Sequence, residues 1–421
     1  MSRHQLKVGL LGCGTVGRGL VELVARSQSL VRQRTGVELA ITRILVRDLT
    51  KFRPGVDCSL LTTEPETVLN NGCDLVVELV GGIEPARTFI RQSLERGKHV
   101  VTANKALLAL EGFSLMRTAE KRKVRLGFEG SVCGGIPIIR ALRNGLVGNK
   151  IQKISGILNG TCNYILTRMA EEGTEFTDAL RAAQAKGFAE ADPTLDIDGH
   201  DAAQKLKILA ELAFNAPVPP DAISLEGIRC ITAADVKATR ELGYVIKHVA
   251  VAEMLDGALS LCAEPVLLAS SHQLAGVRDE NNAVLIYGDA VGEMLFSGKG
   301  AGPLPSASAV LSDMIDIACH QGGFSVTQSD TVAAAVRDYP SPHYFRFDVG
   351  DPSAIGRITA ILERHGIGVT RAAAVWSKNG SAHHQVRVLT DAARRSAVGP
   401  ALQALDSNGA VSGHLVLRIA D

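Results

Sequence analysis

The sequence is poor in aromatic side chains and carries almost no excess charge of either sign. Phe, Trp and Tyr make up 4% of the 421 residues, with a single Trp, whereas 46% of the residues are hydrophobic. The 45 Lys and Arg residues nearly balance 44 Asp and Glu residues, which leaves a formal net charge of +1. Because such a chain has no electrostatic drive towards nucleic acid or an anionic membrane, we expect neither as a partner.

Long hydrophobic runs and closely paired cysteines are also absent. No apolar stretch is long enough to span a bilayer, and the first residues show no signal-peptide pattern, so we expect a cytoplasmic protein. The eight cysteines include no Cys-x-x-Cys pair. A chain of this length, which predicts two or three domains with sizeable cores, does not need disulfides, so we expect reduced cysteines and no zinc site.

A dinucleotide-binding fingerprint opens the chain. An apolar strand over residues 7–11 leads into Gly-Cys-Gly-Thr-Val-Gly, and a helix-compatible run follows. The first glycine of this motif permits a tight turn, the second lets the backbone approach a pyrophosphate, and the third lets helix and strand pack closely. An ordinary glycine turn is the alternative. The motif predicts a nicotinamide cofactor site that includes Gly12, Gly14, Thr15, Val16 and Gly17.

The end of the next strand, about residues 38–46, bears on the choice of cofactor. It carries Arg47 and Asp48, and Lys51 and Arg53 follow. A carboxylate at this position suits the ribose hydroxyls of NAD, whereas basic side chains suit the 2′-phosphate of NADP. We favour NADP because Arg47 comes first and two further basic residues follow, while Asp48 keeps NAD open.

The alternation of strands and helices continues and predicts an α/β fold. Strand patterns at 74–80, 99–102 and 124–128 surround a helix at 85–96, which is typical of a Rossmann-type, doubly wound parallel sheet over residues 1–137. Ligands bind such sheets at the carboxyl ends of the strands. Gly81 and Lys105 fall at these ends, although Lys105 is equally well explained as a surface lysine at the start of a helix.

The glycine-rich loop after the last of these strands contains one carboxylate, that of Glu129. Its glycines allow the chain to bend sharply and expose carbonyl oxygens, which could hold a hard cation such as Na⁺. A plain hinge into the next domain is the alternative.

An α+β domain for catalysis and dimerisation is expected over residues 138–325. Its stretch 187–209 combines five carboxylates and two lysines in an acidic loop followed by a helix, for which Asp198 is the expected N-cap. At about 100° per residue, Lys205 lies on an apolar stripe one turn after Asp201, whereas Lys207 lies on a solvated face. The Asp201–Lys205 pair is either structural or catalytic.

The end of this domain has a second glycine-rich turn before a helix predicted at 307–318. This turn could close over the cofactor or act as a hinge, and we expect the region 303–325 to pack back on the nucleotide domain. A linker is expected at 326–343. The remaining residues, 344–421, show the order β-α-β-β-α-β, which predicts a separate ferredoxin-like domain with a regulatory or dimerising role.

Taken together, several motifs closely resemble those of homoserine dehydrogenases, with a C-terminal domain similar to ACT modules. The motifs are Gly-Cys-Gly-Thr-Val-Gly, Asn104-Lys105-Ala-Leu-Leu-Ala, Glu129-Gly-Ser-Val-Cys-Gly-Gly-Ile-Pro, Leu158-Asn-Gly-Thr-Cys-Asn-Tyr-Ile-Leu, Gly187-Phe-Ala-Glu-Ala-Asp-Pro and Gly300-Ala-Gly. The resemblance implies reduction of L-aspartate 4-semialdehyde to L-homoserine with NAD(P)H, on the route to threonine, methionine and isoleucine.

The resemblance also implies roles for individual residues. Lys205 would be the proton donor, and Lys105 would lie near both nicotinamide and substrate. The implied substrate ligands are Glu190, Asp196, Asp201, Gly160 and Thr161. The implied Na⁺ loop consists of Glu129, Val132, Gly134 and Ile136, and Gly302 would be a second cofactor contact. The chemistry agrees, because hydride addition develops charge on a carbonyl oxygen beside which a protonated lysine is expected.

One departure from the family pattern concerns regulation. ACT modules usually have Asp-x-Pro-Gly before their first helix, but here the sequence is Asp351-Pro-Ser-Ala, which puts binding of threonine or another amino-acid effector in doubt. We expect a homodimer or homotetramer. One alternative is another Rossmann-type amino-acid dehydrogenase. The other is a non-enzymatic nucleotide or amino-acid sensor, and such a sensor would not need Lys205.

Overall fold

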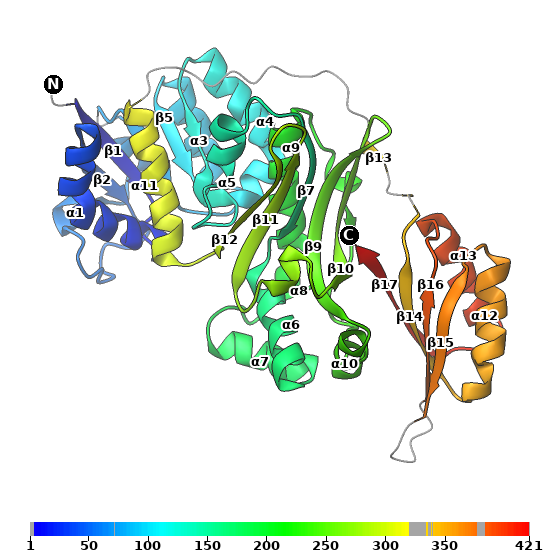
Figure 1. The fold of residues 1–421 in the computed structure, drawn as a ribbon. Helices are drawn as coiled ribbons and strands as arrows, with labels where there is room; N and C mark the ends of the chain where they lie inside the picture. Colours follow the sequence, from blue (N-terminus) through cyan, green and yellow to red (C-terminus); the bar gives the residue numbers. More distant parts are fainter. Residues whose placement is uncertain are drawn as a thin grey trace.

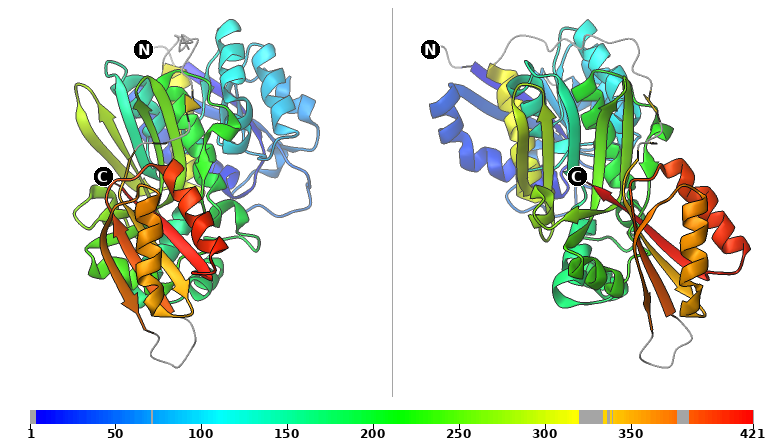
Figure 2. Two further views of the ribbon diagram at one scale, coloured as in Figure 1. Left: turned by 90° about the vertical axis from the view of Figure 1, so that its right-hand side faces the viewer. Right: turned by 45° about the vertical axis from the view of Figure 1, so that its right-hand side comes forward.

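Three parts follow one another in the computed structural model, which describes residues 4–70, 72–319, 334–335, 338, 340–376 and 384–420. An N-terminal domain with a parallel sheet lies at the left in Figure 1, a central domain with long antiparallel strands lies beside it, and a small C-terminal domain lies at the right. The same succession is visible after rotation (Figure 2).

The N-terminal domain has a six-stranded parallel sheet in the order β3-β2-β1-β4-β5-β6. This is the strand order of a Rossmann-type fold, so the predicted doubly wound sheet is confirmed. Its strands are β1 (His4–Leu11), β2 (Val37–Leu45), β3 (Leu61–Thr62), β4 (Leu75–Glu78), β5 (His99–Thr102) and β6 (Leu126–Gly127). Its helices are α1 (Thr15–Thr35), α2 (Pro65–Leu69), α3 (Ala86–Glu95) and α4 (Lys105–Lys121).

Helix α11 (Pro303–Cys319) returns to this first domain from far along the chain. It packs against α1, and its buried Val310 and Met314 belong to the same core as β1 and β2 (Figure 1). The expected packing of this region on the nucleotide domain is therefore present, although residues 320–325 lie outside the described residues. The helix begins at Pro303, four residues earlier than predicted, because proline is favoured in the first turn of a helix.

The central domain consists of a mixed sheet, with the strand order β12-β11-β7-β9-β10, and helices that pack against it. Its strands are β7 (Ile151–Ile157), β8 (Ser224–Leu225), β9 (Tyr244–Leu255), β10 (Ala258–Ala269), β11 (Asn281–Gly288), β12 (Gly292–Lys299) and β13 (Ala334–Ala335). Its helices are α5 (Ile138–Arg140), which continues as a π-helical turn (Ala141–Gly145), α6 (Gly160–Glu172), α7 (Phe176–Ala185), α8 (Thr194–Ile197), α9 (His200–Phe214) and α10 (Ala233–Glu241). Strand β9 was not predicted because it is buried along most of its length and lacks the alternation of a half-exposed strand.

The C-terminal domain has the predicted β-α-β-β-α-β order. Its elements are β14 (His343–Val349), α12 (Ile355–Arg364), β15 (Val369–Val375), β16 (His384–Thr390), α13 (Arg395–Ser407) and β17 (Gly413–Ala420). The strands form an antiparallel sheet in the order β17-β14-β16-β15, as in ferredoxin-like folds.

The prediction that this domain is separate was wrong. Strand β17 pairs in parallel with β10, so the C-terminal sheet continues the central one. A buried ion pair between Arg346 and Asp235 also joins the two domains, with 2.8 Å between Nη1 and Oδ2. The expected linker, 326–343, lies largely outside the described residues, but its last residue already belongs to β14.

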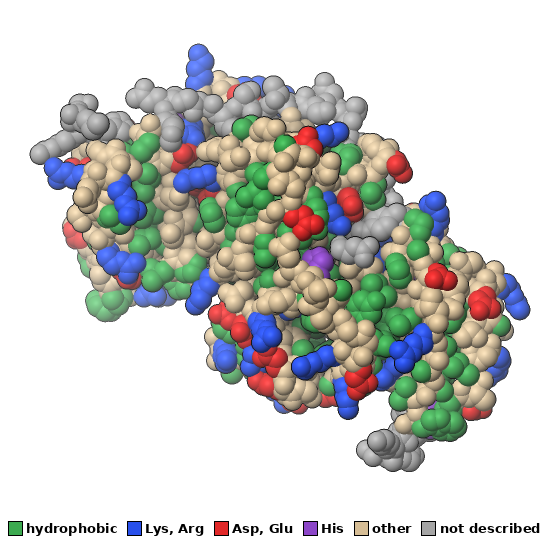
Figure 3. Space-filling model, viewed as in Figure 1, with side chains coloured by type: hydrophobic (Ala, Val, Ile, Leu, Met, Phe, Trp, Pro, Cys, Tyr) green, Lys and Arg blue, Asp and Glu red, His purple; other side chains and the backbone are tan. Residues whose placement is uncertain are grey.

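The surface agrees with the balanced composition. On the face shown in Figure 3, Lys and Arg side chains are interspersed with Asp and Glu side chains. None of the helices in the described part of the chain is long and apolar enough to cross a membrane.

Candidate active site

A crevice of about 770 Å³ lies at the carboxyl ends of β1, β2 and β4. Gly14 lies at the N-terminus of α1, where no side chain caps the helix and nothing lies within 4 Å of an added Cβ. A Cβ on Gly17, in contrast, would lie 2.4 Å from the carbonyl oxygen of Gly12, which itself has a φ of 99°. The tight turn at Gly12, the open space at Gly14 and the close packing at Gly17 are compatible with the predicted roles, and the N–H groups at Thr15 and Val16 have no side-chain cap.

The basic residues after β2 are placed differently from one another. Asp48 Oδ1 accepts hydrogen bonds from the N–H and hydroxyl of Thr50 at 2.8 and 2.6 Å, and these bonds lower the pKa of Asp48. Arg53 donates to the carbonyl oxygens of Asp48 and Lys51. All four residues line the crevice, but Asp48 and Arg53 also stabilise the turn, whereas Arg47 and Lys51 have no such side-chain contact within the described residues.

Two buried polar side chains hold the loops that follow β4 and β5. Glu78 accepts hydrogen bonds from the N–H groups of Val80 and Gly81 at 2.7 and 3.0 Å, and its other oxygen accepts one from Thr102. Asn104 caps α4 through its Oδ1 and donates to the carbonyl oxygen of Gly82 at 2.6 Å. These contacts place Gly81 on the crevice wall and Lys105 at the first residue of α4.

Lys105 and Lys205 come from different domains and meet at one carboxylate. Lys205, which is 8% exposed, donates to Asp201 Oδ2 and to the carbonyl oxygen of Leu158, each at 2.7 Å. Lys105 Nζ lies 2.6 Å from Asp201 Oδ1. Each oxygen of Asp201 therefore faces one lysine, which explains why a lysine is tolerated on an apolar stripe.

The charge states of this group follow from burial and from these contacts. Burial alone would lower the pKa of Lys205, but the neighbouring Asp201 outweighs it and the net pKa lies above its ordinary value. Burial alone would raise the pKa of Asp201, but Lys205 and Lys105 hold it well below its ordinary value. Lys205 is therefore protonated and Asp201 ionised at neutral pH.

A second carboxylate joins the group through Asn159, whose role was not anticipated from the sequence. Asn159 Nδ2 donates to Asp196 Oδ1 at 2.7 Å and to Asp201 Oδ2 at 2.8 Å. The pKa of Asp196 is raised, mainly by burial. Gly160 and Thr161 follow directly as the first residues of α6, so the structure brings them next to the two carboxylates.

The other carboxylates of the acidic stretch have different partners. Asp192 accepts a hydrogen bond from the N–H of Thr194 at 3.1 Å, and Asp198 forms an ion pair with Arg229. Asp198 is therefore not the N-cap of α9, as predicted; that position belongs to Gly199, whose φ of 87° turns the chain. Glu190 is exposed, and its carboxylate has no hydrogen-bond or ion-pair partner within the described residues.

The prediction of a solvated Lys207 was also wrong. Lys207 is 8% exposed and forms an ion pair with Glu211, which is 5% exposed. The pairing was expected from the spacing of the two residues. Their burial was not, because it results from the packing of α4 of the first domain against α9.

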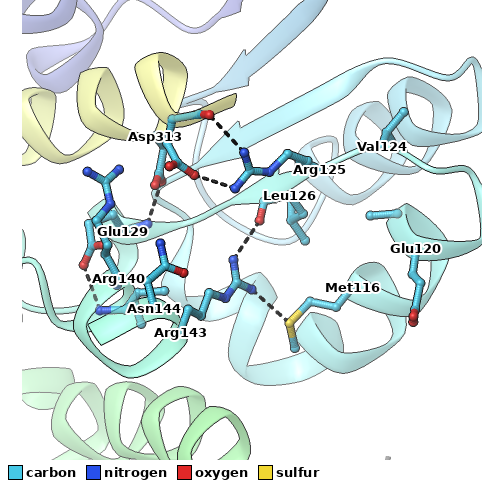
Figure 4. Close-up of a pocket in the computed structure, with 13 residues that line it drawn as sticks. Met116, Glu120, Val124, Arg125, Leu126, Glu129, Arg140, Arg143, Asn144 and Asp313 are labelled. Carbon is cyan, nitrogen blue, oxygen red and sulfur yellow. Dashed lines mark hydrogen bonds and ion pairs between the residues drawn. The ribbon is translucent and has the colours of Figure 1, made fainter. Parts of the chain in front are cut away.

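The carboxylate of Glu129 is held in place by backbone N–H groups. Its two oxygens accept hydrogen bonds from the N–H groups of Ile139 and Arg140, each at 2.8 Å, and burial raises its pKa. Glu129 and Asp313 lie beside one small cavity of about 50 Å³ (Figure 4). Asp313 accepts the N–H of Glu129 at 2.7 Å, and burial raises the pKa of Asp313 to about 7.

The remainder of this loop is compact backbone. Val132 and Ile136 are buried, and Gly134 has a φ of 26°. Across the described ranges, no three or more His, Cys, Asp or Glu side chains form a group that could hold a metal ion. A cation in this loop would therefore need backbone carbonyl oxygens in addition to the Glu129 carboxylate.

The second glycine-rich turn packs against this loop. The N–H of Gly135 donates to the carbonyl oxygen of Lys299 at 2.9 Å. An added Cβ on Gly300 would lie 2.1 Å from Cγ of Asn282, a buried side chain that donates to the carbonyl oxygen of Leu158 at 2.8 Å. Gly302, with a φ of 126°, precedes α11 and is not among the residues that line the crevice of the first domain.

Comparisons with known proteins extend over the whole chain. The family model described as homoserine dehydrogenase, NAD binding domain, matches residues 12–129, and the one described as homoserine dehydrogenase matches residues 137–315. A homoserine dehydrogenase of Pseudomonas aeruginosa is 36% identical over 98% of this chain and 98% of its own length.

Solved structures agree with these matches. The crystal structure of a homoserine dehydrogenase from Thiobacillus denitrificans is 37% identical and has a TM-score of 0.91, covering 99% of this chain and 98% of that one. A hyperthermophilic archaeal homoserine dehydrogenase in complex with NADPH is 29% identical and has a TM-score of 0.64, covering 74% of this chain and 97% of that one.

Proposed function

The chain belongs to the homoserine dehydrogenase family of NAD(P)-dependent oxidoreductases, and we propose that Lys205 is its proton donor in the reduction of L-aspartate 4-semialdehyde to L-homoserine. The observation that carries this proposal is the buried Lys205, which Asp201 keeps protonated. Its ammonium group has three N–H bonds, of which Asp201 and Leu158 engage two. The third is left for a substrate carbonyl oxygen.

When bound, the reduced nicotinamide supplies the hydride for the aldehyde carbon. As the carbonyl oxygen gains negative charge, the Lys205 ammonium stabilises it and then transfers a proton to it. Asp201 remains ionised, so it holds Lys205 in place rather than competing for the proton. Lys105, which is more exposed than Lys205, contacts the same carboxylate from the cofactor domain and would lie between nicotinamide and substrate.

The ends of the amino-acid substrate are assigned by charge. We assign its α-ammonium to Asp196 and Glu190, because Asp196 is in the cluster and the Glu190 carboxylate engages no other group within the described chain. We assign its α-carboxylate to Gly160 and Thr161 at the N-terminus of α6, where the helix dipole favours an anion.

The Lys205→Ala variant tests the proton donor. We expect kcat to fall by about 1000-fold, within the range for loss of a general acid, while the Kd for NADPH stays unchanged. Lys237→Ala removes an exposed lysine from α10 and serves as the control, with normal kcat expected. Near-normal turnover in Lys205→Ala would contradict the assignment.

For the cofactor, we propose a preference for NADP over NAD. Arg47, Lys51 and Arg53 are basic residues on the crevice wall, and the Asp48 carboxylate, which lies directly after Arg47, is turned towards Thr50. In Arg47→Ala we expect the KM for NADPH to rise by about tenfold to 100-fold, the cost of a lost charge-assisted hydrogen bond, with little change for NADH. An equal effect on both cofactors would argue against a 2′-phosphate contact.

For Na⁺, we propose a site formed by the backbone carbonyl oxygens of Val132, Gly134 and Ile136 together with Glu129. The support is the turned backbone of this loop together with the buried Glu129 carboxylate, whose oxygens each accept one N–H and keep a lone pair for a cation. Activity should then fall when NaCl is replaced by choline chloride at equal ionic strength. Equal activity in both salts would exclude a functional Na⁺ site.

For the C-terminal domain, we propose an ACT-like module that contributes to a homodimer or homotetramer and does not respond to an amino-acid effector such as threonine. The support is the stretch Asp351-Pro-Ser-Ala, which lacks the glycine that ACT modules usually have before their first helix. In its place Asp351 accepts the N–H of Ser353 at 2.9 Å and caps the turn. Activity should be the same with and without added threonine, and clear inhibition would refute an unresponsive module.

A further inference from the structure

We propose that Asn159 is a positioning residue of this reaction, because its side-chain amide joins the two carboxylates Asp196 and Asp201 and fixes the plane in which the Asp201 carboxylate meets Lys105 and Lys205. The proposal rests on the function assigned above. Asn159 does not itself contact the reacting atoms; it acts through the residues that do.

The contacts of Asn159 use every polar atom of its side chain. The residue is 3% exposed and lies between the end of β7 and the start of α6. Both hydrogens of Nδ2 are donated, to Asp196 and to Asp201. Oδ1 accepts the N–H of Cys162 at 2.8 Å and so caps α6. The amide cannot rotate without losing all three hydrogen bonds.

This arrangement gives Asp201 Oδ2 two donors, Asn159 and Lys205, while Oδ1 is left to Lys105. If the Asn159 donor were absent, the Asp201 carboxylate could rotate out of its plane. Lys205 would then keep only its hydrogen bond to the Leu158 carbonyl oxygen in a fixed direction. Orientation of the third N–H towards a substrate carbonyl therefore depends on Asn159.

Asn159 also offsets the repulsion between the two carboxylates. Burial has the largest effect on Asp196 and raises its pKa. The hydrogen bond from Asn159 lowers this pKa, whereas the negative charge of Asp201 raises it further. A hydrogen bond donated to the ionised form favours that form. Loss of the donor should therefore protonate Asp196 at a higher pH and remove the partner proposed for the substrate's α-ammonium.

The alternative is that Asn159 matters only as the N-cap of α6. The Asn159→Asp variant separates the two roles. An aspartate has the same size and can still accept the N–H of Cys162, so the cap is kept. While ionised, however, it donates no hydrogen bond and adds a third negative charge beside Asp196 and Asp201.

The test is the pH profile of aldehyde reduction between pH 5.5 and 9. We expect kcat/KM of Asn159→Asp to be about 100-fold below that of the unmodified enzyme at pH 8.5, a cost typical of misplaced catalytic groups. On acidification the new carboxyl group takes up a proton and becomes a donor again. The deficit should therefore shrink towards pH 5.5, and the KM for the semialdehyde should rise more than the KM for NADPH.

A matched control lies one turn further along α6. Asn163→Asp adds the same charge to the same helix, but Asn163 Oδ1 already accepts from Lys247, which can pair with the new carboxylate. This variant should keep the pH profile of the unmodified enzyme. A constant ratio of Asn159→Asp to unmodified activity at every pH, or the same profile shift in Asn163→Asp, would overturn the proposal.

The result can be separated from a failure of the assigned chemistry. If Lys205→Ala retains turnover, the proton donor is wrong whatever Asn159 does. If Lys205→Ala is inactive but Asn159→Asp has normal kcat/KM at every pH, only the positioning role is wrong. Circular dichroism and the melting temperature of Asn159→Asp confirm that it is folded, and unchanged NADPH binding confirms that the cofactor domain is intact.

Discussion

Lys207→Met is a direct test of the difference between a surface ion pair and the buried pair that the structure shows. Methionine retains the length and apolar character of the lysine side chain but removes its ammonium group. The variant leaves Glu211, 5% exposed, with only the N–H of Val218 as a donor at 3.1 Å. The stability cost therefore measures how far the Lys207–Glu211 pair is removed from water.

The two descriptions differ by nearly an order of magnitude. An exposed pair with four-residue spacing on a helix contributes about 0.3–0.5 kcal/mol. Removing one partner of a buried pair costs about 3–5 kcal/mol, because an unpaired charge remains. Since Glu211 can take up a proton and keeps one backbone donor, we expect the lower end, about 3 kcal/mol. For a domain of this size that corresponds to about 6–12 °C in Tm.

The measurement is differential scanning calorimetry, which resolves the transition of the domain that contains α9. Burial raises the pKa of Glu211 even beside Lys207, and loss of the lysine raises it further. A carboxyl group whose pKa is higher in the folded state stabilises the fold at acidic pH, and that stability is lost as the pH rises through the folded pKa. The Tm deficit should therefore be larger at pH 8 than at pH 5.

Two further variants make the result interpretable. Arg26→Ala removes one partner of the exposed pair with Glu22, whose side chains are 60% and 63% exposed, and should change Tm by about 1–2 °C at most. Lys207→Met combined with Glu211→Gln should regain part of the lost stability, because no buried charge remains. A Tm deficit in Lys207→Met as small as that of Arg26→Ala would refute the reasoning.

The remaining predictions concern the two glycine-rich loops. Gly300→Ala should displace Asn282, since the new Cβ would lie 2.1 Å from its Cγ. We expect the free energy of unfolding to fall by about 1–3 kcal/mol. We also expect a lower kcat, because the carbonyl oxygen of Leu158, which accepts from Lys205, loses its second donor, Asn282. An unchanged Tm would contradict this. Burial raises the pKa of Asp313 to about 7. Its contribution to stability is therefore complete below the pKa of the unfolded state and decreases as the pH rises to about 7. The Tm advantage of the unmodified protein over Asp313→Asn should therefore fall between pH 4 and 8, with an upper bound of about 4 kcal/mol, and a pH-independent difference would show that Asp313 does not titrate in this range.

Local features could be predicted from the sequence where they depend only on residues that are close to one another along the chain. The glycines of the fingerprint could be assigned individually, and the geometry at Gly12 and Gly17 requires glycine as predicted, through a positive φ at Gly12 and a close backbone contact at Gly17. Amphipathic periodicity located Lys205 on the apolar side of α9 and paired it with Asp201. Both conclusions depend on residues within a few turns of each other, so no knowledge of the remaining fold was needed.

Errors arose where a second element, distant in sequence, covers the surface. The periodicity of α9 alone predicts a solvent-exposed Lys207, but α4 packs against α9 and Lys207 is buried. Asp198 is a good N-cap by residue type, but Arg229 engages its carboxylate. The C-terminal domain was expected to be separate because no sequence pattern reveals that β17 adds to β10.

The sequence by itself determined the Rossmann-type sheet, the β-α-β-β-α-β order of the C-terminal domain, the family and the pairing of Lys205 with Asp201, because periodicity and local motifs encode them. Only the tertiary structure decided how the acidic residues divide their roles. Asp201 lies between lysines of two domains, Asn159 joins it to Asp196, and Asp192 and Asp198 stabilise the loop instead. The physical reason is that hydrogen bonds and charge pairing depend on distances across the fold, which residue spacing along the chain does not specify.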